Sequence, residues 1–316
     1  MKTHFLVLPF VLLVIAFMTS CAPAVSATPV PKPATTVPQS QAPAAQSLQS
    51  TNEAISVVKA YIDTANTGDF DKTLAFFADD AVVYNPLGVF VGKDEISKWL
   101  TDDVKTTRAT VKDIQVQGSL VVATGTVSLA RFQDAGIGEV AYRAEYMVAG
   151  DKVRFFAPTV QLTPDQQSKM KTAQANGPAV PTSQINPEDV AKAYVDAANS
   201  GDFDKTISFY ADDAAALVMN NTLLLSGKDQ ISNWLKGDVQ TTRATPQDWQ
   251  VNGNVVINNG MVSLARFTKL GIDQVSYQSI YVVENGKIRF FRPTLILTPQ
   301  QQAAIQAAQP TPTNTP

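Results

Sequence analysis

The chain carries two kinds of hydrophobic pattern, and they follow one another in the same order twice. In the first copy, apolar residues such as Val57, Tyr61 and Ala65 recur at helical spacing. Gly68 interrupts this pattern, and a short helix, an extended run and a further helix around Trp99 come after it. The rest of the copy alternates apolar and polar residues in three or four runs, as half-buried antiparallel strands do. Helices followed by a strongly bent sheet predict an α+β domain.

The second copy repeats the first over most of its length. The stretch GDFDKTLAFFADDA begins at Gly68, and GDFDKTISFYADDA begins at Gly201. Tyr61 therefore corresponds to Tyr194. The second copy then has an insertion of two residues before GKD, after which the register holds through VSLARF to the end of both copies. A period of this length indicates a duplicated domain rather than a solenoid repeat.

Composition and repetition together predict six segments. They are a signal peptide at 1–20, a Pro/Ala/Thr-rich disordered tether at 21–50, a first domain at 51–164, a linker at 165–186, a second domain at 187–300 and a disordered tail at 301–316. The tether and the tail lack the large apolar side chains that would offset the entropy lost on ordering.

The beginning of the chain is predicted to be an export signal. Lys2 supplies a positive charge, and the apolar run FLVLPFVLLVIAFM is too short for an ordinary membrane span. MTSC, ending at Cys21, resembles the lipobox of bacterial lipoproteins. The resemblance implies cleavage before Cys21 and acylation of its thiol and its new amine, which would anchor the protein stably in a membrane. The alternative is cleavage after Ala27, which would give a secreted protein.

Composition narrows the chemistry further. The net charge is -3 and the sequence has no basic run, so that no nucleic-acid partner is expected. Cys21 is the only cysteine, which excludes an internal disulfide and a thiolate metal cluster. The only histidine, His4, lies in the leader, so that the mature chain would have none. We expect no metal and no cofactor.

The order of elements resembles that of the nuclear transport factor 2-like superfamily. The resemblance is carried by a helix, the GD break, the strand entry at ADDA, the GKD…W helix and the meandering strands. It covers about residues 52–163 and 187–298. It implies two tandem cone-shaped domains, each with three N-terminal helices packed on a strongly bent antiparallel sheet. SnoaL-type polyketide cyclases and ketosteroid isomerase share this fold, which hosts enzymes, binding proteins and scaffolds alike.

Comparison with ketosteroid isomerase argues against catalysis. Tyr61 and Tyr194 stand where the isomerase has a tyrosine that donates a hydrogen bond to the developing oxyanion. The position of the isomerase's base aspartate is Asn85 in the first copy and Val218 in the second. Because an amide does not take up a proton near neutral pH, the general base is missing. We therefore predict no catalytic residue.

Other acidic residues offer little to a pocket. SnoaL-type cyclases resemble this chain but use an aspartate and histidines. Asp63 and Asp196 follow the helix tyrosines by two positions and are expected to face solvent. The paired acids of ADDA, Asp79 and Asp80 in the first copy, are expected at a helix-to-strand corner outside the pocket.

The expected pocket residues are mostly aromatic. They are Tyr61, Asn85, Trp99, Tyr142 and Tyr146 in the first copy, and Tyr194, Trp234, Tyr277 and Tyr281 in the second. The strand tyrosines of each copy are an even number of residues apart and share one strand face. The two tryptophans also fit a role in core packing. The arginine of SLARF, Arg131 or Arg266, fits either an anionic ligand or a neighbouring carboxylate.

Three functions remain open. The first is a non-catalytic, envelope-tethered module that binds a small apolar or amphipathic ligand or a protein partner. The second is an isomerase, dehydratase or cyclase that uses Glu139 or Glu145; Gln274 and Ile280 replace these acids in the second copy, which would then be degenerate. The third is a structural scaffold in which the two copies form an intramolecular pseudo-dimer.

Overall fold

The computed structural model describes residues 51–85, 88–175, 185–238 and 241–308. The expected signal peptide, Cys21, the tether and the end of the tail lie outside the described residues. In the part that is described, no helix combines the length and the apolar character needed to cross a membrane.

The first domain has five helices and six strands among its described residues. In chain order they are α1 (Thr51–Thr67), α2 (Phe70–Ala75), β1 (Phe77–Asn85), β2 (Gly88–Val91), α3 (Gly92–Asp103), β3 (Arg108–Gln117), β4 (Leu120–Ser128), α4 (Ala130–Asp134), β5 (Val140–Ala149), β6 (Lys152–Gln161) and α5 (Pro164–Ala175).

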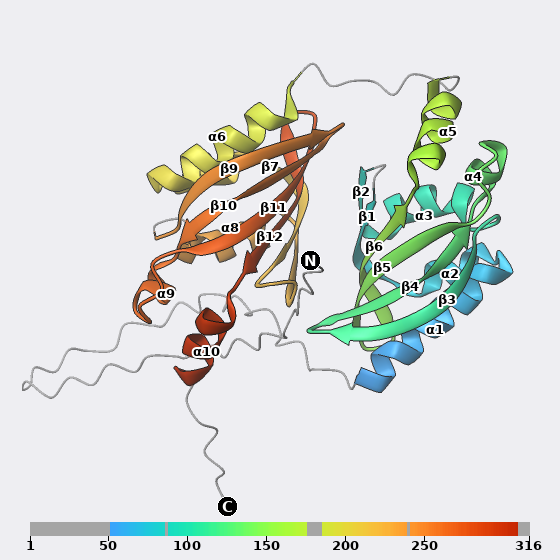
Figure 1. Cartoon of the computed structure of the whole chain (residues 1–316), viewed down its shortest axis with the longest axis horizontal. Coiled ribbons are helices and arrows are strands. Elements are labelled where there is room, and N and C mark those ends of the chain that lie inside the picture. The colour runs from blue at the N-terminus through green and yellow to red at the C-terminus, as the bar shows by residue number, and fades with distance from the viewer. Residues whose placement is uncertain (1–50, 86–87, 176–184, 239–240, 309–316) are drawn as a thin grey trace, which may run out of the picture.

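The second domain repeats this order (Figure 1). Its elements are α6 (Pro187–Ser200), α7 (Phe203–Ser208), β7 (Tyr210–Val218), β8 (Leu223–Ser226), α8 (Lys228–Asp238), β9 (Arg243–Asn252), β10 (Val255–Ser263), α9 (Ala265–Thr268), β11 (Val275–Glu284), β12 (Lys287–Ile296) and α10 (Pro299–Ala307).

Each domain contains one six-stranded sheet, so that the α+β class is confirmed. The strand order is β2-β1-β6-β5-β4-β3 in the first domain and β8-β7-β12-β11-β10-β9 in the second. Two details differ from the expected arrangement. The third helix of each domain follows a strand hairpin, and β1 runs parallel to β6 as β7 does to β12, so that each sheet is mixed. The parallel pairs arise because the last strand of each domain, β6 or β12, lies beside the first strand, β1 or β7.

The repeated fourteen-residue stretch builds a turn and a helix cap. Gly68 and Gly201 both have φ of 76°, a left-handed conformation that favours glycine. Asp69 then caps α2 by accepting a hydrogen bond from the Lys72 backbone N–H at 3.1 Å, and Asp202 caps α7 in the same way. The stretch therefore has a structural role.

An asparagine fixes the first helix of each domain on its sheet. Asn66 of α1 donates to the Ala109 carbonyl at 2.8 Å and accepts from the Ala109 N–H at 2.7 Å. Asn199 and Ala244 repeat this pair of bonds in the second domain. The helix is thereby held at a constant position over the strands.

Both domains extend beyond the boundaries expected from sequence. The expected linker begins inside α5, and the expected tail begins inside α10. Thr298 caps α10 in a capping box with Gln301, and Thr163 and Gln166 exchange the same two bonds before α5. The signal was present in the sequence as LTPDQQ and LTPQQQ, in which a threonine precedes proline at the first helical position.

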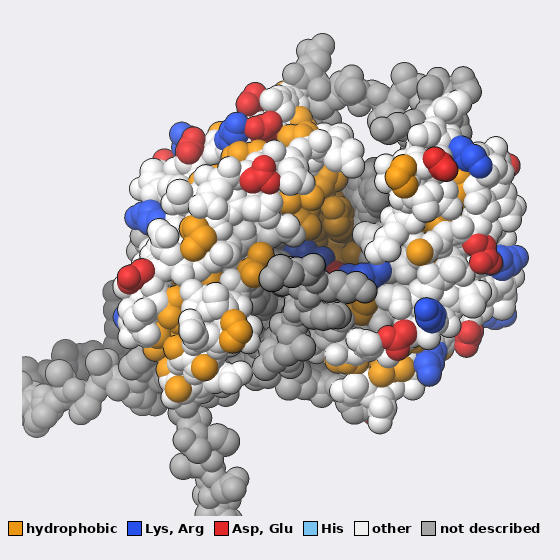
Figure 2. All heavy atoms as spheres, viewed as in Figure 1, with side chains coloured by type: hydrophobic (Ala, Val, Ile, Leu, Met, Phe, Trp, Pro, Cys, Tyr) orange, Lys and Arg blue, Asp and Glu red, His pale blue; other side chains and the backbone are white. Residues whose placement is uncertain are grey.

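The two sheets also contact each other. One buried apolar cluster combines residues of both domains, including Phe155 and Phe290, whose ring centroids lie 5.9 Å apart. Tyr84 stacks on Phe290 at 5.1 Å. Helices α1 and α6 lie on the sides of the sheets that face away from this cluster (Figure 1). On the face shown in Figure 2, basic and acidic side chains are interspersed around the outer surface.

Candidate functional site

The first domain encloses a cavity of about 460 Å³ between its helices and the concave face of its sheet. All five residues expected in its wall are there: Tyr61 from α1, Asn85 at the end of β1, Trp99 from α3, and Tyr142 and Tyr146 from β5. We call this the Tyr61 cavity. Its volume lies within the range of small-molecule sites. The placement is established, whereas a ligand contact by these residues stays a prediction.

Strand alternation decides which side chains of β5 reach the cavity. Tyr142, Ala144 and Tyr146 face it, whereas Arg143 and Glu145 between them do not line it. At the base of the cavity the Tyr61 ring makes edge contacts with its neighbours, including Tyr146 at a centroid distance of 5.8 Å. Such packing holds the aromatic wall in place.

Two polar atoms of this wall are buried without a hydrogen-bond partner in the described part of the chain. They are the Tyr142 hydroxyl and the Trp99 indole Nε1. Tyr142 is 8% exposed, and burial raises the pKa of its hydroxyl, so that it stays protonated at neutral pH. Both groups are therefore hydrogen-bond donors on residues that line the cavity.

No aspartate, glutamate or histidine is among the described residues that line the Tyr61 cavity. The charged residue in its wall is Arg131, whose guanidinium lies 5.4 Å from the centroid of the Phe132 ring. Asn85, at the position of the isomerase's base, is buried in the wall. The cavity is thus mainly apolar, with a few neutral polar groups and one arginine.

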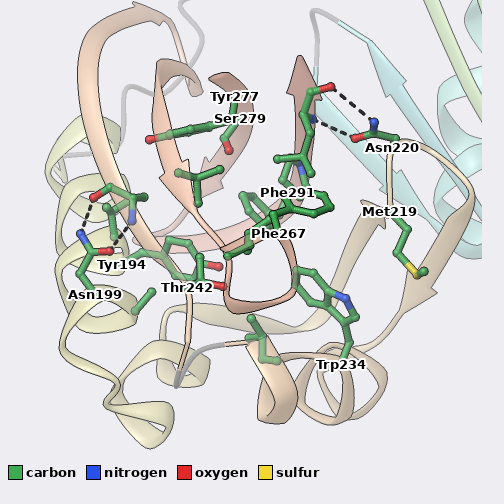
Figure 3. Close-up of a pocket in the computed structure, with 18 of the residues that line it drawn as sticks. Tyr194, Asn199, Met219, Asn220, Trp234, Thr242, Phe267, Tyr277, Ser279 and Phe291 are labelled. Atoms are coloured by element: carbon green, nitrogen blue, oxygen red, sulfur yellow. Dashed lines mark hydrogen bonds between the residues drawn. The ribbon is translucent and has the colours of Figure 1, made fainter. Parts of the chain in front are cut away.

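The second domain has a smaller cavity of about 150 Å³, which we call the Tyr194 cavity. Its wall contains the four residues expected there, Tyr194, Trp234, Tyr277 and Tyr281. Figure 3 labels the first three of them. The guanidinium of Arg266 in its wall lies over a phenylalanine ring, as that of Arg131 does in the first domain.

The inserted turn of the second domain forms part of the wall of this cavity. Met219 and Asn220 adopt positive φ and line it, as Figure 3 shows. The Asn220 side chain accepts a hydrogen bond from the Leu295 N–H at 2.9 Å and donates to the Leu295 carbonyl at 3.4 Å. The turn is thereby attached to β12. The sequence signals for it were the insertion of two residues before GKD and the divergent stretch LVMNNTLLL.

Sequence reasoning also missed Asn258 of β10. The Tyr277 hydroxyl donates a hydrogen bond to Asn258 Oδ1, and the Asn258 side-chain amide donates to the Asp248 carbonyl at 3.0 Å. Burial raises the pKa of Tyr277 to about 12. The first domain has Ala123 at the place of Asn258. The available signal was the pair of asparagines, Asn258 and Asn259, in the middle of a mostly apolar strand.

The carboxylates considered for catalysis lie elsewhere. Glu145 forms ion pairs with Arg143 and with Arg292 of the second domain. Burial by itself would raise the pKa of Glu145, but the two guanidinium groups outweigh it and hold the pKa below its ordinary value. Glu139 is exposed. An enzyme that uses either acid in the Tyr61 cavity is therefore not supported by the geometry.

The remaining acids have surface roles. Asp63 and Asp196 are exposed, as expected from their helical positions. Asp79 and Asp80 lie at the start of β1 and pair with Lys93 and Arg154. Arg154 thus pairs with an acid of its own domain, and Arg289 of the second domain pairs with Glu95, Asp213 and Glu284.

The SnoaL-like domain model matches residues 58–170 and again residues 191–291, which together exceed half of the chain. The chain belongs to the SnoaL-like domain family, with two such domains in tandem. Membership supports a ligand-binding domain or one of the isomerase or cyclase type.

Solved structures similar to this chain include three bacterial proteins. They are a nuclear transport factor 2-like protein of unknown function from Cytophaga hutchinsonii (13% identity, 38% of this chain and 96% of that chain, TM-score 0.32), a protein from Sphaerobacter thermophilus (24%, 35% and 97%, 0.29) and a cystatin-like-fold protein of unknown function from Xanthomonas campestris (20%, 38% and 97%, 0.33). Similarity at this level says nothing about what either domain binds. Comparison with curated protein sequences found no match.

Proposed function

We propose that this protein is an exported, membrane-tethered binding protein that holds a small apolar ligand in the Tyr61 cavity and does not convert it. The observation that carries the proposal is the composition of the cavity wall. A space of about 460 Å³ is enclosed by aromatic and aliphatic side chains, with neutral donors and one arginine. Such a wall stabilises an apolar ligand by burial and orients it through a few polar groups.

The cavity wall supports binding without turnover, because no aspartate, glutamate or histidine is among its described residues. An isomerase, dehydratase or cyclase needs a positioned base. Asn85 stands at the base position, and the nearby acid Glu145 is held by Arg143 and Arg292 on the other side of the sheet. Tyr61 keeps its place in the wall, where it supports packing around a ligand as well as it would support catalysis.

The proposed location rests on the leader sequence. Lys2, the apolar run after it and MTSC at Cys21 support export followed by lipidation. Growing the host with an alkyne-tagged palmitate should label the wild-type protein and leave a Cys21→Ser variant unlabelled. Release of an unlabelled wild-type protein into the medium would instead favour cleavage after Ala27 and a secreted form.

Purification of the full-length chain from its host tests the binding role. Native mass spectrometry should detect one apolar molecule bound per chain, and denaturing extraction should return it chemically unchanged. Turnover of a steroid-like or polyketide-like substrate that disappears in Tyr61→Phe would contradict the proposal and favour an enzyme.

The contacts between the sheets favour a second, structural role for the duplication. We propose that the two domains form an intramolecular pseudo-dimer through the apolar cluster around Phe155 and Phe290. Cleavage at a protease site placed within residues 176–184 would break the covalent link between the two domains. They should still elute together in size-exclusion chromatography, and elution as two independent monomers would refute the pseudo-dimer.

A further inference from the structure

Two corresponding tyrosines differ in the partner of their hydroxyl. Tyr142 on β5 and Tyr277 on β11 hold the same position in the repeat, and each lines the cavity of its own domain. The Tyr277 hydroxyl donates to Asn258 Oδ1 on the neighbouring strand. The Tyr142 hydroxyl has no hydrogen-bond partner in the described part of the chain, because Ala123 replaces the asparagine.

A buried donor without an acceptor is destabilising, and native proteins keep few of them. The Tyr61 cavity holds two, the Tyr142 hydroxyl and the Trp99 Nε1. An indole N–H only donates, whereas a hydroxyl can donate or accept. An acceptor atom of a ligand would give either donor the hydrogen bond that it lacks in the described part of the chain.

The second domain is arranged in the opposite way. Asn258 satisfies Tyr277, and the turn that carries Met219 and Asn220 takes up space at the wall. Its cavity of about 150 Å³ is smaller than the usual range for small-molecule ligands. Two differences between the copies, the partner of the corresponding tyrosine and the turn at Met219 and Asn220, thus accompany the difference in cavity volume.

We propose that the first domain alone is the ligand site, and that its ligand is an apolar molecule whose carbonyl or ether oxygen accepts a hydrogen bond from the Tyr142 hydroxyl, with the Trp99 indole N–H as a second donor. This inference rests on the proposed binding function and narrows it to one domain and one ligand class. In this proposal the role of the second domain is structural: it keeps the fold and packs against the first domain.

Two fluorescent probes test the ligand class on the full chain. Prodan is a naphthalene with a ketone oxygen, and N-phenyl-1-naphthylamine is of similar size and has no carbonyl. Tyr142→Phe removes the donor and keeps the ring. We expect it to weaken prodan binding about tenfold and to leave binding of N-phenyl-1-naphthylamine within about twofold of wild type.

A pair of substitutions at Ala123 separates hydrogen bonding from loss of space. Ala123→Asn gives Tyr142 the internal acceptor that Tyr277 already has, and Ala123→Leu adds a side chain of the same branched shape and number of non-hydrogen atoms without an acceptor. Ala123→Asn should weaken prodan binding more than Ala123→Leu does. The two variants should bind the probe without a carbonyl equally well. Circular dichroism melting of each variant establishes that it is folded.

The matched pair Ala144→Leu and Ser279→Leu assigns the domain. These residues correspond in the repeat and line the Tyr61 and the Tyr194 cavity respectively. Ala144→Leu should reduce binding of both probes, and Ser279→Leu should change neither. The reverse result would overturn the assignment to the first domain.

The outcomes distinguish this inference from the function on which it rests. Binding of both probes with equal affinity in wild type and Tyr142→Phe would overturn the role of Tyr142 while the binding function stands. Binding of neither probe by the wild-type chain would overturn both.

Discussion

Glu145 of the first domain and Arg292 of the second form an ion pair in which Glu145 Oε2 and Arg292 Nη1 lie 2.7 Å apart. Both side chains are largely buried, 10% and 13% exposed. Their counterparts in the repeat are Ile280 and Ala157, which both belong to the apolar cluster between the sheets. The two copies therefore differ at these positions: Glu145 and Arg292 are charged, whereas the corresponding residues Ile280 and Ala157 are apolar.

This difference predicts that the domains pair with each other rather than with copies of themselves. Arg292→Ala leaves Glu145 buried with Arg143 as its remaining partner, and we expect a loss of about 2–4 kcal/mol in the free energy of unfolding. Adding Glu145→Ile recreates the Ile280 and Ala157 combination and should recover most of that loss. Urea unfolding of the full chain measures both. A double variant no more stable than Arg292→Ala would contradict the argument.

The same pair predicts a dependence of stability on pH. Arg292 and Arg143 face Glu145 together with Tyr84, and the net effect lowers the pKa of Glu145 from its ordinary value of 4.5. A lowered pKa contributes stability that is present above the unfolded value and is lost as pH falls through the folded value. Wild type should therefore lose more stability below about pH 4.5 than the Glu145→Ile, Arg292→Ala variant does.

Thermal melting of the two proteins between pH 7 and pH 3 measures this difference. Comparing the two proteins separates the effect of Glu145 on the pH dependence of stability from that of Glu284, which has the opposite sign. Burial raises its pKa, so that its contribution to stability is lost as pH rises. If the melting temperatures of the two proteins fell equally as the pH is lowered, Glu145 would contribute nothing to the acid transition.

The two cavity tyrosines should respond differently to loss of the hydroxyl. Tyr277→Phe leaves the buried Asn258 Oδ1 without its donor, and we expect it to cost about 1–3 kcal/mol of unfolding free energy. Tyr142→Phe removes a hydroxyl that has no internal partner and should be neutral or slightly stabilising in the ligand-free protein. Equal losses for both variants, measured by urea unfolding, would mean that Tyr142 is satisfied within the protein.

Helix α10 should contribute to the stability of the second domain. Ile305 is 6% exposed and packs in the cluster that includes Phe267 and Tyr277. Ile305→Ala should cost about 2 kcal/mol, whereas Gln306→Ala on the exposed side of the same helix should cost little. Thermal melting compares them. An Ile305→Ala variant as stable as Gln306→Ala would place α10 outside the cooperative unit.

The sequence by itself determined the duplication, the class of fold and the aromatic residues of both cavity walls. These features are local: they depend on helical and strand periodicity and on turn chemistry, which short stretches of sequence contain. The even spacing of Tyr142 and Tyr146 was enough to place both on one face of a strand.

Only the tertiary structure decided which cavity is larger and where Glu145 points. Whether a tyrosine hydroxyl is satisfied depends on Ala123 or Asn258 on the adjacent strand, far from it in sequence. The direction of Glu145 depends on Arg292 in the other domain. Contacts of this kind are set when strands and domains pack together, because burial and electrostatic pairing act between residues that the chain itself keeps apart.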